Sequence, residues 1–339
     1  MIMGVTRKDV ARLAGVSTAT VSYVINDGPR PVSEETRKKV LWAIEQLGYR
    51  PSAIARSLAT KRTNNVGFVL PDILNPVHAA IAKAFEDALR AAGYSLAIGN
   101  SDESSDREEA YLQAFLSKEF DGIALTPTGE NRRLLFSLVE SGKHLVLLDR
   151  QLEGLNVDCV LFDNEVGTCQ AVRHLIEHGH SRIGLINLAR SKTPGQERFE
   201  GYRRALLEAG IKVEPELVLE GSFKAQEGGR LAESLLHVDP PPTALFVGSN
   251  RLMSGVLRVV KERKIRVPED LALATFDDVG HYADRTPSIT AVSTSTAQFG
   301  SEAARLLIER MSGTYTGDPR AVRVPCELKV RESTVGISL

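Results

Sequence analysis

One short stretch of the sequence carries residue types that could bind and activate zinc. His174, Glu177 and His178 form a His-x-x-Glu-His pattern, which places two imidazoles one helical turn apart beside a carboxylate that could act as a general base. Taken alone, this pattern predicts a zinc hydrolase. A structural explanation is also open, because short patterns arise by chance and Gly179 can end a helix whose negative end attracts histidines.

The sequence contains no phosphate-loop, dinucleotide-binding or Gly-x-Ser-x-Gly pattern. We therefore expect no cofactor, no metal, no catalytic residues and no enzymatic activity, and we keep the zinc hydrolase as an alternative.

A second group of polar residues stands just after short apolar runs. Ligands of open α/β sheets bind beyond the carboxyl ends of the strands, which is where these side chains would lie. An Asp or Asn after a strand can instead cap a helix or form a turn, and that alternative is open for each residue taken singly. Together they predict one small-molecule cleft, formed by Asp72, Asn75, Asp149, Asn250 and Asp277.

Alternating strands and helices are needed to position these residues. After a polar linker, apolar runs alternate with amphipathic stretches, as is typical of parallel sheets covered by helices. The last segment, with a helix over 298–311, is expected to cross between two lobes and form a hinged clamp. The predicted strands are 66–70, 95–99, 123–125 and 145–148 in a first series, 159–162, 183–188, 245–247 and 271–276 in a second, and further strands near 322 and 328.

The charges divide the 339 residues into a basic start and an acidic remainder. Residues 1–62 contain 11 Lys and Arg against 5 Asp and Glu, whereas the rest contains 31 against 38. This distribution is expected of a nucleic-acid-binding module joined to a separate domain. The start lacks the apolar core of a secretory signal, and no stretch is apolar enough for a membrane span, so we expect a cytoplasmic protein. The widely spaced Cys159, Cys169 and Cys326 are expected to be reduced, buried thiols.

The basic segment, residues 1–50, has the pattern of a helix-turn-helix module. Thr6 can cap a first helix, Gly15 offers a sharp turn, and Ser17 can cap a second helix with a small, hydrogen-bonding outer face. Ser33 can cap a third helix that ends at Gly48. Residues 51–65 follow as a hinge and linker. Their helical part is only about two turns long, so we expect it to fold only when a partner orders it.

These stretches resemble the lac-repressor (LacI/GalR) family. The matching runs are Thr-Arg-Lys-Asp-Val-Ala-Arg-Leu-Ala-Gly-Val-Ser-Thr-Ala-Thr-Val-Ser at 6–22, Val-Ile-Asn at 24–26 and Gly-Tyr-Arg-Pro-Ser-Ala-Ile-Ala-Arg-Ser-Leu at 48–58, and the match extends along nearly the whole chain. The resemblance implies a transcriptional regulator, expected to act as a repressor, that binds a palindromic double-stranded DNA operator as a homodimer. It also implies a body like a periplasmic binding protein, with two Rossmann-like parallel-sheet subdomains.

The resemblance assigns DNA-contacting roles to residues of the module and the hinge. Thr18, Ala19 and Tyr23 stand where base-contacting side chains lie. In the family, paired hinge helices enter the minor groove and a leucine wedges between base pairs, which kinks the duplex; the matching positions here are Ala55 and Leu58. The positions that match phosphate contacts are Ser17, Thr20, Ser22 and Asn26.

The resemblance also singles out Arg198, Phe223, Asn250 and Asp277 as effector-contacting positions in the body, residues 66–339. The arginine fork suits a vicinal diol or carboxylate, and a phenyl ring can cover an apolar sugar or base face. A polyol, sugar, sugar acid or nucleobase would fit. The expected N-lobe spans about 66–162 and 291–321, and the expected C-lobe spans about 163–290 and 322–339.

Two positions depart from the family. His78, which we assign to the effector site, stands where many relatives have an aromatic residue, and Arg251 stands where an Asp is common. The cation predicts an acidic effector, such as a sugar acid or a phosphorylated sugar, unless Arg251 points to solvent.

The remaining alternative is a solute-binding receptor without a role on DNA, because the bilobed body alone would look the same. A basic helix-turn-helix occupies the place where a periplasmic receptor needs a signal peptide. The effector is expected to open or close the lobes and so to change the spacing of the paired linkers. No leucine heptad tail follows the last predicted strand, which favours a dimer over a tetramer.

Overall fold

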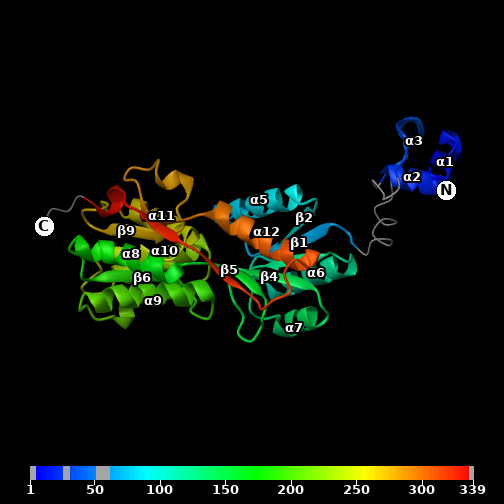
Figure 1. The fold of residues 1–339 in the computed structure, drawn as a ribbon. Helices are drawn as coiled ribbons and strands as arrows, with labels where there is room; N and C mark the ends of the chain where they lie inside the picture. The colour runs from blue at the N-terminus through cyan, green and yellow to red at the C-terminus, as the bar shows by residue number, and fades with distance from the viewer. Residues whose placement is uncertain (1–4, 26–30, 51–61, 336–339) are drawn as a thin grey trace. The chain divides into compact units, whose positions relative to one another are not determined.

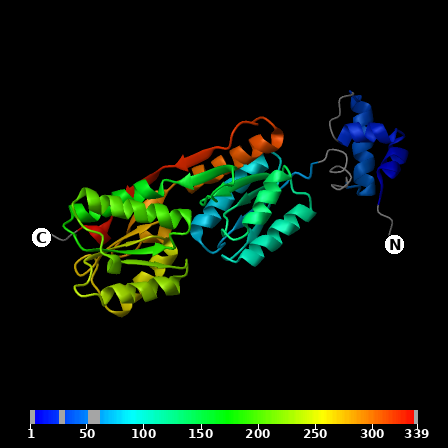
Figure 2. The same ribbon diagram turned by 90° about the horizontal axis from the view of Figure 1, so that it is seen from below.

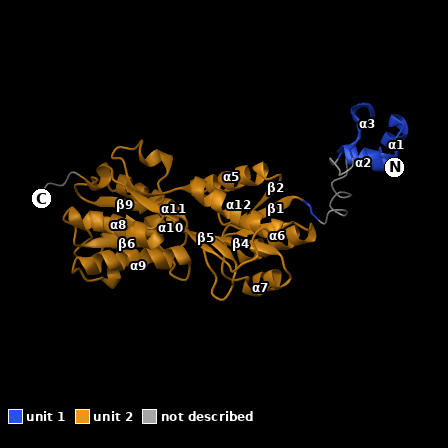
Figure 3. Cartoon of the chain, in the orientation of Figure 1, with its two compact units in different colours: residues 1–63 blue, residues 64–339 orange. Residues whose placement is uncertain are grey.

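The computed structural model describes residues 5–25, 31–50 and 62–335, and it divides the chain into two compact units at Thr63 and Asn64 (Figure 3). This division falls inside the expected linker, residues 51–65. None of the helices in the described ranges is both long and apolar enough to cross a membrane.

The first unit is a three-helix module whose caps are those expected. Its helices are α1 (Arg7–Ala14), α2 (Thr18–Ile25) and α3 (Glu34–Leu47). The Asp9 carboxylate accepts hydrogen bonds from the backbone N–H and the hydroxyl of Thr6, at 2.9 and 2.6 Å, and so fixes the start of α1. Gly15 and Gly48 end α1 and α3 with φ angles of 67° and 59°, where a side chain would be strained. The small core between the helices is formed by Val10, Ala11, Ala14, Val21, Val24, Val40, Ala43 and Tyr49.

The second unit contains two lobes, each a six-stranded sheet with helices on both faces (Figures 1 and 2). The N-lobe sheet is parallel throughout and has the order β11-β5-β4-β3-β1-β2. Helices α5 and α12 cover one face, and α6 and α7 cover the other. The elements are β1 (Asn65–Leu70), α5 (Pro76–Ala91), β2 (Ser95–Asn100), α6 (Ser105–Ser117), β3 (Gly122–Leu125), α7 (Arg132–Glu140), β4 (His144–Leu148), β5 (Asp158–Phe162), α12 (Thr296–Ser312) and β11 (Ala321–Val324).

The C-lobe repeats this strand order, as β12-β10-β9-β8-β6-β7, but its outer strand β12 pairs antiparallel with β10. Helices α10 and α11 cover one face, and α8 and α9 cover the other. The elements are α8 (Asn164–Glu177), β6 (Ile183–Leu188), α9 (Thr193–Glu208), β7 (Val218–Gly221), α10 (Ala225–Leu236), β8 (Ala244–Val247), α11 (Asn250–Glu262), β9 (Ala272–Phe276), β10 (Thr290–Thr294) and β12 (Cys326–Lys329), with short 3-10 helices at Pro215–Leu217, Gly280–Tyr282 and Glu332–Thr334.

Strand pairing corrects one strand assignment and two expected lobe boundaries. Residues 159–162 lie in the N-lobe sheet, as the expected bounds of 66–162 require, rather than in the second strand series, because β5 pairs with β4. Strand β10 starts the segment expected in the N-lobe, yet it pairs with β9 of the C-lobe. Residues 322–324 were expected in the C-lobe, but β11 pairs with β5, and the side chain of Val324 is fully buried there. The chain therefore passes between the lobes at residues 163, 295 and 325.

Candidate effector cleft and DNA-contacting helix

Helix α2 presents the side chains expected to contact DNA bases. Thr18 and Ala19 are exposed and Tyr23 is half-buried, whereas Val21 and Val24 on the opposite side are buried in the module core. The structure thus keeps one face of α2 available, as a recognition helix requires.

The residues expected to contact phosphates lie at the start of α2 and along it. The Ser17 hydroxyl accepts a hydrogen bond from the backbone N–H of Thr20 at 3.0 Å, and the two hydroxyls lie 2.9 Å apart. Ser22 is half-buried. Asn26, Ala55 and Leu58 lie outside the described residues.

Arg198 forms the base of the C-lobe wall of the cleft. Its side chain is only 4% exposed. Its Nε donates to Asn164 Oδ1 at 2.9 Å, its Nη1 donates to the carbonyl of Gly248, and its guanidinium lies 3.7 Å from the centre of the Phe276 ring. These contacts hold the guanidinium in one orientation, so it can present its remaining N–H groups to a ligand without further ordering.

Asn250 connects the two walls of the cleft. Its amide nitrogen donates to Asn75 Oδ1 in the N-lobe at 2.9 Å, and its backbone N–H donates to Asp277 Oδ2 at 3.4 Å. Asn250 is 3% exposed, and its Oδ1 has no hydrogen-bond partner among the residues that the structure describes. Buried polar atoms are rarely left unpaired, so this oxygen keeps the capacity to accept a hydrogen bond.

The acidic residues of the cleft have unusual backbone or electrostatic settings. Asp149 and Asp277 adopt left-handed φ angles of 64° and 71°, as do the nearby Asp102 and Glu103 at 52° and 59°. Non-glycine residues in this region carry strain and cluster at functional sites. Burial raises the pKa of Asp277, and the positive charge of Arg198 partly opposes this rise.

His78 lies on the N-lobe wall, in the first turns of α5. Its Nδ1 lies 3.1 Å from the backbone carbonyl oxygen of Asp72. Burial lowers the pKa of His78, and the charge of Asp149 acts in the opposite direction. The imidazole is therefore neutral at neutral pH, and it can act as one donor and one acceptor toward a ligand.

Arg251 does not point freely to solvent, nor does it offer an uncompensated positive charge. Its Nε lies 3.2 Å from Asp72 Oδ2 of the N-lobe, and the two side chains are 34% and 20% exposed. The pair bridges the lobes and neutralises both groups. Because Asp72 neutralises Arg251, the charge of Arg251 no longer predicts an acidic effector.

Three further residues at the cleft were not predicted from the sequence. Glu103 pairs with Arg150 of its own lobe at 2.5 Å and with Lys192 of the C-lobe at 2.5 Å. Burial alone would raise the pKa of Glu103, but the hydrogen bonds and charges of Arg150 and Lys192 lower it to about 2. The Arg150 guanidinium also lies 5.2 Å from the ring centre of Phe223 in the C-lobe. These three residues lie in loops and belong to no recognisable sequence motif, so the ion-pair group becomes visible only in the folded structure.

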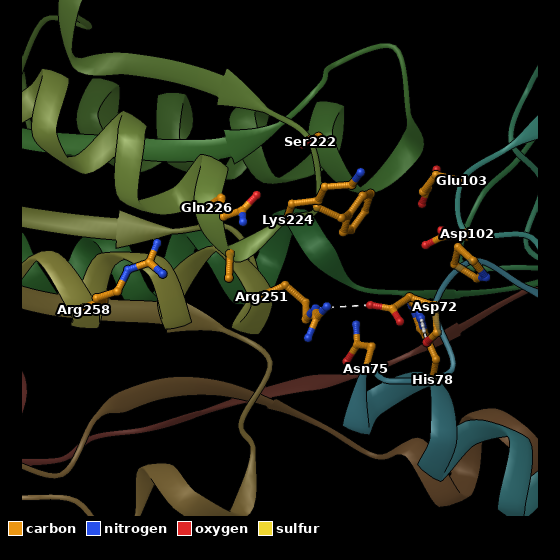
Figure 4. A pocket seen from close by; sticks show the side chains of 13 residues that line it. Asp72, Asn75, His78, Asp102, Glu103, Ser222, Lys224, Gln226, Arg251 and Arg258 are labelled. Carbon is orange, nitrogen blue, oxygen red and sulfur yellow. Dashed lines mark hydrogen bonds and ion pairs between the residues drawn. The ribbon is translucent and has the colours of Figure 1, made fainter.

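Six of the eight expected effector residues meet around one small cavity, whereas Asp72 lines only the larger chamber beside it and Asn250 lines neither space. Asn75, His78, Asp149, Phe223 and Asp277, together with Arg198, line a space of only about 20 Å³. A larger chamber of about 450 Å³ adjoins it and shares Asn75, His78 and Phe223 (Figure 4). Its volume lies within the range of roughly 300–1,000 Å³ that is common for small-molecule sites.

The zinc-like pattern has structural partners instead of a shared metal-binding geometry. His174 Nε2 lies 2.7 Å from Thr334 Oγ1, and His178 Nδ1 lies 2.8 Å from the backbone oxygen of His174. Burial, aided by the charge of His178, lowers the pKa of His174 to about 4. No group of three His, Cys, Asp or Glu residues within the described ranges could hold a metal ion.

Comparison with known proteins decides the family. Residues 6–52 match the family described as bacterial regulatory proteins, lacI family, and residues 172–334 match the periplasmic binding protein-like domain. Catabolite control protein A of Priestia megaterium is 36% identical over 334 residues, which cover 98% of this chain and 100% of that protein. The chain belongs to the lacI family of bacterial regulatory proteins. The repressor PurR of Pasteurella multocida is 34% identical, over 97% of this chain and 98% of its own length.

Solved structures of this family agree with the fold. A transcriptional regulator CelR in complex with cellobiose is 35% identical over 97% of this chain and 99% of its own, with a TM-score of 0.73. The lac repressor dimer bound to operator superposes with a TM-score of 0.87 over 98% of this chain and 100% of its own, at 24% identity. The predicted fold class and family are confirmed. This lacI-family member is a DNA-binding transcriptional regulator with a small-molecule-binding body, and the alternative of a receptor without a role on DNA is wrong.

Proposed function

We propose that this regulator is a dimeric repressor that binds a palindromic operator, and that a sugar or sugar derivative in the cleft sets its affinity for that operator. The contact between Asn250 and Asn75 carries the proposal. One side chain there joins both lobes and still offers an unpaired oxygen, so a ligand that binds it also acts on the lobe spacing. Since the target is chromosomal DNA, we place the protein in the cytoplasm.

Each expected effector residue has a role that its setting supports. The buried guanidinium of Arg198 would hold a vicinal diol, and Asn250 and Asp277 would bracket hydroxyl groups. The half-buried ring of Phe223 would cover an apolar sugar face. On the N-lobe side, Asp72, Asn75, His78 and Asp149 would complete the hydrogen bonds when the lobes close. The cellobiose in the CelR complex supports a carbohydrate over a nucleobase.

On DNA, Thr18, Ala19 and Tyr23 would contact bases in the major groove. Ser17, Thr20, Ser22 and Asn26 would contact phosphates, and Ala55 and Leu58 of the paired hinge helices would enter the minor groove. The ligand would change the free energy of forming the hinge helices on DNA. A coupling of about 1–3 kcal/mol would change operator affinity by roughly 5- to 150-fold.

Two linked experiments test the proposal. Selection of bound duplexes from a random pool by the full-length protein should recover an inverted repeat, with half-sites about one helical turn apart. A thermal-unfolding screen of sugars and polyols should then find a ligand that stabilises the protein and changes its affinity for the selected duplex. Recovery of no inverted repeat, or a stabilising ligand with no effect on operator affinity, would contradict the proposal.

A further inference from the structure

The larger chamber reaches well beyond the residues expected to hold the effector. Besides Asp72, Asn75, His78 and Phe223, its lining includes Lys224, Gln226 and Arg258 of the C-lobe, which we call the outer subsite. Figure 4 shows Arg258 at one end of the lining and Asp102 and Glu103 at the other, with Gln226 and Arg251 between them. The chamber is therefore elongated, and a ligand that fills it contacts chemistry other than that around Arg198.

Close packing of two helices builds the wall of the outer subsite. Arg251 and Arg258 are two helical turns apart on α11 and so project from the same side of it. The start of α10 contacts α11 at Gly255, where a Cβ atom would lie 1.8 Å from the carbonyl oxygen of Ala225. Glycine at 255 thus lets Lys224 and Gln226, at the start of α10, lie against the helix that carries Arg258.

The charges along the chamber are not balanced from one end to the other. Its acidic side chains already have partners: Asp72 pairs with Arg251, Glu103 pairs with Arg150 and Lys192, and Asp102 lies 3.3 Å from Arg107. Arg107, Arg150 and Lys192 lie outside the lining of the chamber.

The two cations of the outer subsite, Lys224 and Arg258, differ from the acidic side chains of the chamber because they are unpaired within the described ranges. Neither Lys224 nor Arg258 forms an ion pair with any residue in the described ranges, and both side chains are exposed. The first turn of α10 carries Glu227, but its carboxylate pairs with Arg230 at 2.7 Å and so does not neutralise Lys224. The outer end of the chamber is thus electropositive, while the rest of its lining is compensated.

We infer that the effector carries an anionic substituent, a carboxylate or a phosphate, which binds the outer subsite while its sugar part lies against Phe223, His78 and Asn75. This inference rests on the proposed function, because it names the chemical class of that same effector. A guanidinium forms paired hydrogen bonds with the oxygens of either anion, and the ammonium of Lys224 adds a second positive charge. The acidic effector that the sequence suggested at Arg251 is thus recovered at different residues.

The inference is tested with matched ligands that differ only in charge. Full-length protein is titrated calorimetrically with glucose, glucuronate and glucose 6-phosphate, with galactose and galacturonate, and with cellobiose and cellobionate. In at least one set the anionic member should bind about 10-fold more tightly than its neutral partner, which corresponds to about 1.4 kcal/mol. The preference should weaken as salt rises, because the outer subsite is exposed. The carboxylate and phosphate members of the glucose set distinguish the two anions.

Single substitutions on α11 test whether the preference for anionic ligands comes from Arg258. Arg258→Gln should remove most of the preference for the anionic member and leave the affinity for the neutral member within about 2-fold, and Arg258→Lys should restore part of the preference. Lys261→Gln removes the same charge from an exposed site on the same helix that does not line the chamber, so it should retain the preference. The melting temperature of each variant without ligand reports whether it has folded.

Two results would overturn the inference. One is a neutral member that binds as tightly as its anionic partners in every set, and the other is an anionic preference that survives in Arg258→Gln. Neither result touches the proposed function, which fails if no inverted repeat is recovered or if a stabilising ligand leaves operator affinity unchanged. Conversely, Arg198→Ala should abolish the binding of neutral and anionic members alike.

Discussion

The two lobes have the same strand order but face the cleft with different chemistry. In the C-lobe, the cleft residues Arg198, Asn250 and Asp277 are all less than 7% exposed; Arg198 and Asp277 form hydrogen bonds within the lobe, and the Asn250 side chain also donates to Asn75 of the N-lobe. In the N-lobe, Asp72 and Glu103 remain 20% and 27% exposed, and both form ion pairs that reach across to the C-lobe.

This difference indicates a division of roles between the lobes. Fixed, buried groups keep a ligand in one orientation, whereas partly exposed ion pairs contribute little to stability and can break and reform. We therefore expect the C-lobe to hold the effector and the N-lobe to close over it.

Replacing Arg198 with alanine should have the largest effect. The change leaves Asn164 Oδ1 and the Gly248 carbonyl without their donor and Asp277 without its neighbouring cation. The free energy of unfolding should fall by about 3 kcal/mol, and the stabilisation by effector should disappear. Urea denaturation with and without effector measures both. A variant that still responds to effector would show that the C-lobe is not the holding lobe.

Replacing Gly255 with alanine should have the next largest effect. Its Cβ would lie 1.8 Å from the backbone oxygen of Ala225, so α10 and α11 must separate. We expect a loss of about 2 kcal/mol in thermal or urea unfolding, together with weaker effector binding. Gly229→Ala is the matched control, because its nearest neighbours lie at 3.4–3.6 Å and alanine favours the helix. Equal losses for the two variants would refute the packing argument.

Acidification should lower the stability of the C-lobe. The pKa of His174 in the C-lobe is about 4, against an ordinary value of 6.5. Between these two pH values the unfolded chain binds more protons than the folded chain, so the free energy of unfolding decreases as the pH falls. Glu103 and Asp158 in the N-lobe have pKa values of about 2 and stay ionised in that window. Hydrogen exchange at pH 7 and pH 5 should show the C-lobe around His174 losing about 1–3 kcal/mol of protection. His174→Gln should flatten this pH dependence, and a C-lobe with equal protection at both pH values would contradict it.

Replacing Glu103 with glutamine should have the smallest effect on stability. At neutral pH the loss of its pairs with Arg150 and Lys192 should cost about 1 kcal/mol. Because the pKa of Glu103 is lowered from 4.5 to about 2, this contribution is present above pH 4.5 and is lost as the pH falls toward 2. Urea unfolding of both proteins from pH 7 to pH 3 measures the difference. A constant difference across that range would exclude an ionic origin.

Much of the fold could be predicted because its strands are buried. Residues 183–188 are buried at every position, and their apolar run, interrupted by Asn187, marks β6 at the correct bounds. Strand β7 was missed because Val218–Gly221 is a short edge strand, half-buried throughout. The crossings between the lobes were misplaced because pairing between segments distant in the chain decides them, as for β11 with β5.

The residues of the candidate site also divide into those that the sequence could predict and those that it could not. Asp149 and Asp277 were found because each follows a buried strand, and the resemblance supplied Arg198 and Phe223. Neither route could find Glu103 or Lys192, since the 2.5 Å contact between them exists only when two lobes meet. Local sequence likewise could not show that Asp72 neutralises Arg251, because the two residues lie in different lobes.

The position of Pro325 between β11 and β12 has a consequence for biosynthesis. Residues 321–324 complete one sheet and residues 326–329 complete the other, so a single short stretch supplies the last strand of both. As the nascent chain leaves the ribosome, β5 and β10 each keep an unpaired edge until this stretch arrives, and such edges invite pairing with other chains. The lobes thus mature together in one late step, well after the helices of the first unit have been synthesised.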